Sequence, residues 1–188
     1  MKKLLLLIPV LLLFSCAADD GSVTQEEVTL LVNHYKTTSR FFLANNYLVQ
    51  ENENIGSNHF FEVHEIIGFT PTPAIIYEIT ATKFTIKNPG TSATTNEYEL
   101  IDILSETPVS AFTFFNIPLN RYDHFGNSVV SWVTGTDELG YFISNEIEID
   151  CRKLCPYFKS LLFEQAVITG VFEHGQNGEY ILKELLKY

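Results

Sequence analysis

Short apolar runs separated by turn-forming residues fill most of the chain after residue 26. The run from Ile79 to Ile86 is rich in β-branched residues and ends at Asn88-Pro-Gly90, where proline fixes φ and glycine permits positive φ. Runs of this kind are typical of strands. The pattern predicts strands over 27–35, 47–50, 60–69, 75–87, 97–104, 109–119, 129–133, 141–144 and 146–150.

The two ends of the body carry the remaining elements. Ser22, followed by Gln25 and Glu26, could open a helix through a capping box, but the β-branched content of residues 27–35 favours a strand. Residues 166–173 and 179–186 flank a glycine-rich connection, which predicts a β-hairpin. Proline at 156 and the apolar spacing after it predict one short helix over 156–163.

The fold class expected from these elements is mainly β, a small antiparallel barrel or sandwich with one short helix near 156–163. Residues 27–108 form one β-rich domain. Residues 109–188 form either a second packed subdomain or a continuation of the same barrel, because no low-complexity linker separates the two halves.

The first 20 residues carry a different pattern. Lys2 and Lys3 precede an apolar run, Leu4 to Phe14, whose eleven residues would span roughly 16 Å as a helix, about half of a bilayer core. Leu13-Phe-Ser-Cys16 resembles the lipobox of bacterial lipoproteins. The resemblance implies a signal peptide over 1–15 and a mature chain that begins at acylated Cys16. A plain secretory signal or an ordinary cysteine is the alternative.

Two acidic residues follow the cysteine. Ala17, Ala18, Asp19 and Asp20 resemble the export signal that sends Bacteroidota lipoproteins to the outer leaflet of the outer membrane. The expected location is therefore the outer membrane, with the body facing the cell exterior. In the alternative, Asp19 and Asp20 belong only to the solvated tether expected over 16–26, and the body faces the periplasm.

The charge of the chain limits the classes of partner that it can bind. The chain has 12 basic and 23 acidic residues, and removal of residues 1–15 would take away two lysines, which changes the net charge from −11 to −13. Nucleic-acid binding depends on clustered Lys and Arg, which this chain lacks, so it is excluded. With 46% apolar residues the mature chain has ample material for a core.

Cys151 and Cys155 are the other cysteines. With Cys16 acylated they form an even pair in an oxidising compartment, so a disulfide is the favoured interpretation. Residues four apart on a straight strand lie about 13 Å from each other, beyond disulfide reach. The bond therefore requires a chain reversal, which Pro156 favours. Two free thiols, or a metal or redox role, are the alternatives.

Other polar residues offer weak candidate sites. Of the histidines at 34, 59, 64, 124 and 174, only His59 and His64 are close in sequence, and their odd separation would place them on opposite faces of a strand. No metal site and no cofactor are expected. Carboxylates at 97, 99, 102 and 106 could form a glycosidase pair, but a polar outer face is the favoured interpretation.

Aromatic residues are densest from Phe112 to Phe125, where they are expected mainly to fill a core. Those left exposed could stack on a glycan or anchor a protein partner. The common nucleophile-elbow, phosphate-loop, zinc-protease and dinucleotide-binding motifs are absent from the sequence.

One further resemblance covers residues 28–108. Segments 47–53, 61–69, 77–80 and 98–107 resemble a small β-rich domain-of-unknown-function family that is common in bacterial lipoproteins and often stands beside META domains. Members often carry a cysteine pair in the first strand and loop, which this chain lacks, and residues 70–74 replace the expected Glu-Pro-Gly turn. The resemblance implies a fold and no activity.

The favoured function is that of a membrane-anchored, non-enzymatic binding or accessory module. Its partners would be the membrane, through acyl chains on Cys16, and a protein or glycan, through exposed aromatics. The alternative is a small hydrolase or carbohydrate-active enzyme. A cavity with a desolvated carboxylate or histidine beside a nucleophile would favour the enzyme.

Overall fold

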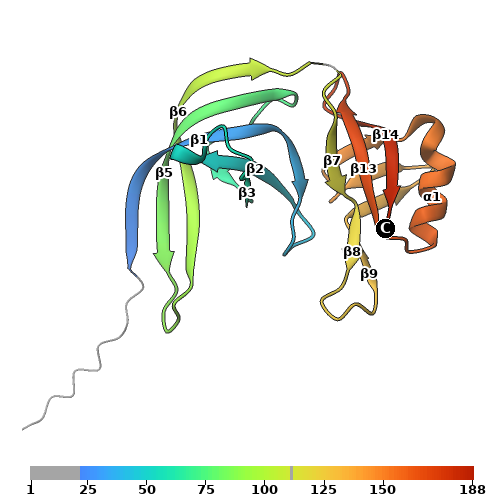
Figure 1. Cartoon of the computed structure of the whole chain (residues 1–188), viewed down its shortest axis with the longest axis horizontal. Coiled ribbons are helices and arrows are strands. Elements are labelled where there is room, and N and C mark those ends of the chain that lie inside the picture. Colours follow the sequence, from blue (N-terminus) through green and yellow to red (C-terminus); the bar gives the residue numbers. More distant parts are fainter. Residues whose placement is uncertain (1–21, 111) are drawn as a thin grey trace, which may run out of the picture.

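A computed structural model describes residues 22–110 and 112–188 and confirms the expected β-rich class. Two six-stranded sheets, built from consecutive parts of the chain, stand side by side, and a short helix covers the second sheet (Figure 1). We refer to them as the N-terminal sheet and the C-terminal sheet. No strand ladder joins them within the described residues.

The N-terminal sheet is a curled half-barrel with strand order β3-β2-β1-β5-β6-β4. Side chains at alternate positions of the long strands are buried, as at Val28, Leu30 and Val32 of β1, so one face of the curl encloses a core. Its strands are β1 Val23–Thr38, β2 Asn45–Glu51, β3 Phe61–Val63, β4 Ile66–Ile67, β5 Ile75–Lys87 and β6 Thr94–Pro108, with a 3-10 turn at Asn52–Asn54.

The C-terminal sheet has the order β10-β11-β12-β14-β13-β7. Its strands are β7 Phe115–Pro118, β10 Val133–Thr136, β11 Gly140–Ile143, β12 Ile147–Asp150, β13 Ile168–His174 and β14 Tyr180–Lys187. β13 and β14 form the expected hairpin, and β8 Asn120–Tyr122 with β9 Val129–Ser131 forms a separate two-stranded ribbon.

The predicted helix is confirmed as α1, Cys155–Phe163. It lies in the connection from β12 to β13, and its buried Phe158 and Leu161 pack into the core of the C-terminal sheet. The predicted disulfide is present between Cys151 and Cys155. The 3-10 turn Arg152–Leu154 supplies the required reversal and brings the two Cα atoms to 4.9 Å.

Several predicted boundaries are wrong. The expected strand over 60–69 is broken into β3 and β4, which pair with different strands, and Gly68 adopts a φ of +78° that no regular strand allows. The expected strand over 129–133 is divided at Trp132. β1 begins at Val23, so residues 23–26, expected in the tether, belong to the sheet.

The expected strand over 109–119 is also wrong in its first half. Ile75, the first residue of β5, pairs with Pro108, and Val109 donates to the carbonyl of Ala74. Beyond that point β5 offers no partner, so residues 109–110 and 112–114 lie in the linker between the sheets and β7 starts at Phe115.

Candidate functional site

A large irregularity in β1 creates the joint between the two sheets. β1 pairs with β5 only as far as Val32, and its register with β2 jumps from Val32 opposite Val49 to Lys36 opposite Tyr47. Three residues of β1, 33–35, therefore stand against one residue of β2, which bends the strand away from its own sheet.

A bulge of this size frees backbone groups that must find other partners. The amide of His34 donates to Asn33 Oδ1 over 2.8 Å, and the carbonyl of His34 accepts from the amide of Ala74 over 3.2 Å. The amide of Lys36 donates over 3.0 Å to the hydroxyl of Tyr180, which comes from β14. The C-terminal sheet thus completes the hydrogen bonding of a strand in the N-terminal sheet.

Apolar contacts follow the same route. The Tyr35 ring leaves β1 and stacks on Phe115, the first residue of β7, with 4.5 Å between centroids and 21° between planes. Phe115 in turn meets the edge of the buried Tyr180 ring at 4.9 Å. Aromatic pairs of this geometry add to the free energy of burial, so Tyr35 fastens β1 to the core of the C-terminal sheet.

An ion pair crosses the joint beside these rings. Lys36 Nζ donates to Glu146 Oε1, and Asn45 Nδ2 donates to Glu146 Oε2 over 3.0 Å. Lys36 also lies 4.8 Å from the centroid of the Tyr47 ring. Burial raises the pKa of Glu146, but the hydrogen bonds from Lys36 and Asn45 outweigh it and hold the pKa below its ordinary value. The carboxylate therefore stays charged.

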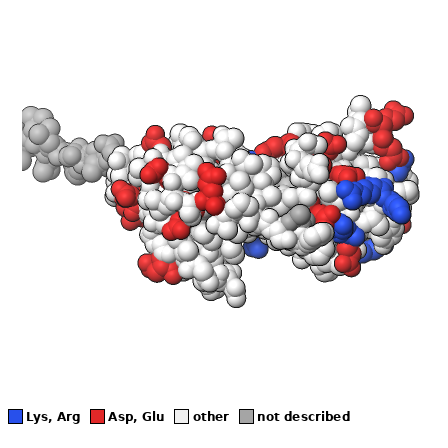
Figure 2. All heavy atoms as spheres, turned by 90° about the horizontal axis from the view of Figure 1, so that it is seen from above, with Lys and Arg blue, Asp and Glu red and all other residues white. Residues whose placement is uncertain are grey.

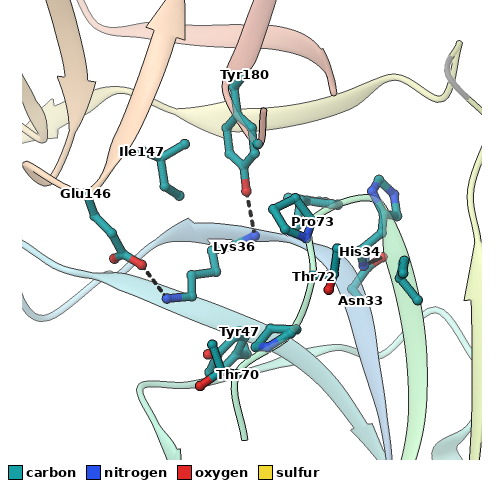
Figure 3. Close-up of a pocket in the computed structure, with 14 residues that line it drawn as sticks. Asn33, His34, Lys36, Tyr47, Thr70, Thr72, Pro73, Glu146, Ile147 and Tyr180 are labelled. Carbon is teal, nitrogen blue, oxygen red and sulfur yellow. Dashed lines mark hydrogen bonds and ion pairs between the residues drawn. The ribbon is translucent and has the colours of Figure 1, made fainter. Parts of the chain in front are cut away.

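These groups surround a cavity of about 190 Å³, shown in Figure 3. Lys36 and Glu146 line one side of the cavity. Residues of the β4–β5 connection line another side: Thr70, Thr72 and Pro73. The cavity has room for a small ligand or for one side chain of a partner.

Two histidines meet at the same joint. His34 Nδ1 lies 2.8 Å from His174 Nε2, while His174 Nδ1 is buried with no partner among the described residues. A buried lone pair without a donor is less unusual than a buried N–H without an acceptor. We therefore assign the shared proton to His174 Nε2, which donates to His34 Nδ1, and the proton of His34 to its Nε2.

Both rings are held neutral. Burial lowers the pKa of His34 to about 4, with a further contribution from His174, and burial lowers the pKa of His174 to about 4. Sequence reasoning missed this pair, because 140 residues separate its members and neither stands in a motif.

The candidates drawn from the sequence are scattered. His59 lies outside any strand and His64 lies between β3 and β4, where its Nδ1 meets Asn46 Oδ1 at 3.2 Å. The carboxylates at 97, 99, 102 and 106 are all exposed along β6, as expected of a polar outer face. Among residues 22–110 and 112–188, no group of three or more His, Cys, Asp and Glu could hold a metal ion.

The aromatic segment 112–125 divides between core and surface. Phe115, Ile117 and Leu119 are buried, whereas Phe112, Phe114 and Phe125 are exposed. Cys16, Asp19 and Asp20 lie outside the described residues, so the lipid anchor and the export signal stay predictions.

Charge is unevenly spread over the face of the molecule shown in Figure 2. On this face acidic side chains lie over both sheets, and most of the visible basic side chains lie on the C-terminal sheet. In the described part of the chain, no helix has the length and apolar character needed to cross a membrane.

Comparison with protein-family models, with curated proteins and with solved structures finds no match.

The first prediction concerns the bond from the bulge to Tyr180. Tyr180→Phe keeps the ring but leaves the amide of Lys36 without an acceptor, so the free energy of unfolding should fall by about 1 to 3 kcal/mol. Urea titration measures this. Tyr157→Phe, at a half-exposed ring on α1, is the matched control and should change little. Equal effects of the two substitutions would contradict the role of the bond.

The second prediction concerns pH. Because the folded chain holds His34 and His174 at a pKa of about 4 and the unfolded chain has ordinary values near 6.5, the unfolded state binds more protons between these limits. The free energy of unfolding should therefore fall by about 2 to 4 kcal/mol from pH 7 to pH 5.

His174→Gln should remove much of that pH dependence, because it removes one titrating ring and the repulsion it exerts on a protonated His34. His124→Gln, at an exposed histidine outside the joint, is the control and should leave the dependence unchanged. An identical slope in both variants would show that the pair does not govern acid sensitivity.

Proposed function

We propose that the protein is a lipid-anchored, non-enzymatic binding module of the outer membrane that faces the cell exterior and engages a protein or glycan partner. The anchor rests on Leu13-Phe-Ser-Cys16, and the outward address on Asp19 and Asp20. Several acyl chains on one residue hold a protein at a membrane far more firmly than a single chain does.

The observation that carries the binding role is the exposure of two phenylalanines in the linker. Phe112 is 80% exposed and Phe114 is 58% exposed. Exposed aromatics provide large, rigid contact area for a protein hot spot or for stacking on a sugar. The linker lies between the sheets at the top of Figure 1, and β1 begins at the lower left. A chain anchored through residue 16 would thus direct the linker away from the bilayer.

The chemistry of the joint supports binding over catalysis. His34 lines the cavity as a desolvated ring, which is one half of the arrangement that an enzyme would need. Its Nδ1 is paired with His174, however, and not with a hydroxyl or thiol that it could activate. Lys36 is likewise engaged with Glu146. These groups hold the two sheets together, which favours the module over the hydrolase.

The third prediction tests the anchor. Cys16→Ser removes the thiol that acylation requires, so the chain should leave the membrane fraction and lose its acyl mass. A chain with both Cys151→Ser and Cys155→Ser controls for loss of cysteine as such and should stay membrane-bound. Unchanged partitioning of Cys16→Ser would refute the lipid anchor.

The export signal has a separate test. Asp19→Ala together with Asp20→Ala should keep the anchor but reduce protease accessibility on whole cells.

The fourth prediction tests the partner surface. A benzophenone side chain placed at Phe112 of the full chain should give a discrete photo-adduct on intact cells, because the linker aromatics contact the partner. Protease sensitivity of the added mass separates a protein partner from a glycan. The same probe at Phe163, the exposed aromatic of α1, is the control. Equal labelling at both positions, or none at Phe112, would argue against the linker as the binding surface.

A further inference from the structure

The β1–β2 turn presents three consecutive apolar side chains to solvent. Phe41 is 83% exposed, Phe42 68% and Leu43 63%. The turn itself is fixed: Ser39 Oγ accepts from the amides of Phe41 and Phe42, and the amide of Ser39 donates to the carbonyl of Ala44. The three side chains are therefore held outward in an ordered turn.

A second aromatic turn lies on the same side of the molecule. Trp132 Nε1 donates over 3.0 Å to the carbonyl of Phe42, which ties the β1–β2 turn to the C-terminal sheet. The neighbouring β8–β9 ribbon ends in a turn whose Phe125 is 80% exposed. In Figure 1 both turns point downward, toward the side on which β1 begins.

Cationic groups accompany the β1–β2 turn. Arg40 and Arg121 line one open hollow together with Thr38 and Trp132. The Arg121 guanidinium lies 5.7 Å from the Trp132 ring, and its buried Nε has no partner in the described structure. Arg40 is largely exposed, with its Nε 3.7 Å from Glu62. A lipid interface has phosphates above an acyl layer. The two arginines suit the phosphates, and the apolar side chains of the turn suit the acyl layer.

The length of chain between the predicted anchor and the sheet limits how far these turns can be from lipid. The six Cα-to-Cα steps from Cys16 to Ser22 reach at most about 20 Å even when fully extended. The start of β1 must then lie close to the bilayer surface, and the two aromatic turns project toward the same side.

We propose that the β1–β2 turn, Phe41 to Leu43, docks into the interfacial layer of the membrane that carries the anchor, with Phe125 as a second contact. This docking rests on the proposed lipid anchor. Phenylalanine and leucine enter the headgroup and acyl boundary, while Arg40 and Arg121 face lipid phosphates. The acylated chain would carry a net charge of −13, which disfavours an anionic lipid surface, so the surface we propose is zwitterionic. Docking fixes the orientation of the body and keeps the linker segment away from the bilayer.

The test uses the full acylated chain in phosphatidylcholine vesicles, with and without bromine on the acyl chains. Phe41→Trp places a reporter on the turn, and Phe163→Trp places one on α1 at a similarly exposed ring. The parent chain, with only Trp132, supplies the background. The emission of the reporter at position 41 should shift to the blue in vesicles and be lost with brominated lipid, whereas the reporter at position 163 should be unaffected.

Flotation separates the two ways of failing. A chain that does not float with vesicles overturns the proposed anchor, and the docking with it. If the chain floats but the reporter at position 41 is not quenched, the docking alone is overturned. This is the result expected if the turn bound a protein instead of lipid. Equal quenching at positions 41 and 163 also overturns it, because the body would then have no fixed orientation.

Discussion

The joint between the two sheets depends on one constraint, that backbone groups freed by the bulge in β1 must find hydrogen-bond partners. Residues 33–35 have no ladder partner among the described strands, and the amide of Lys36 is completed by the hydroxyl of Tyr180 from the other sheet. An unmatched buried amide costs about 1 to 3 kcal/mol. The bulge therefore requires the C-terminal sheet, and the stacking of Tyr35 on Phe115 and the ion pair of Lys36 with Glu146 follow from the same bend.

The joint brings charged and titratable side chains together in a region that is partly buried from solvent. The ion pair of Lys36 with Glu146 is only partly buried, so it contributes little net free energy by itself. Glu146 is matched by Lys36 and Asn45, and the two histidines stay neutral because burial lowers the pKa of each ring. The arrangement fixes how the sheets meet at neutral pH and weakens as the histidines gain protons.

Local patterns in the sequence were sufficient for the β-rich class, α1, the β13–β14 hairpin and the Cys151–Cys155 bond, because each is decided by residues close in sequence. The hydrophobic pattern gave wrong strand bounds where the chain leaves one strand partner for another. Residues 109–110 and 112–114 have no remaining length of β5 to pair with. The run from 60 to 69 breaks between β3 and β4 and ends at Gly68, whose φ is positive. His34 and His174 could not be paired from sequence, since only the completed joint brings them within 2.8 Å. The anchor at Cys16 rests on local resemblance and awaits its own test.

The proposed anchor and docking would orient the body, with the two aromatic turns toward the membrane and the linker segment, which carries exposed phenylalanines, on the opposite side. We infer that the joint makes the two sheets a single cooperative unit. Native-state hydrogen exchange tests it at the amides of Val49 and Phe172, one in each core. In a single cooperative unit both amides should have the same opening free energy and the same denaturant dependence. Exchange of Phe172 through a lower-energy opening that leaves Val49 protected would contradict it.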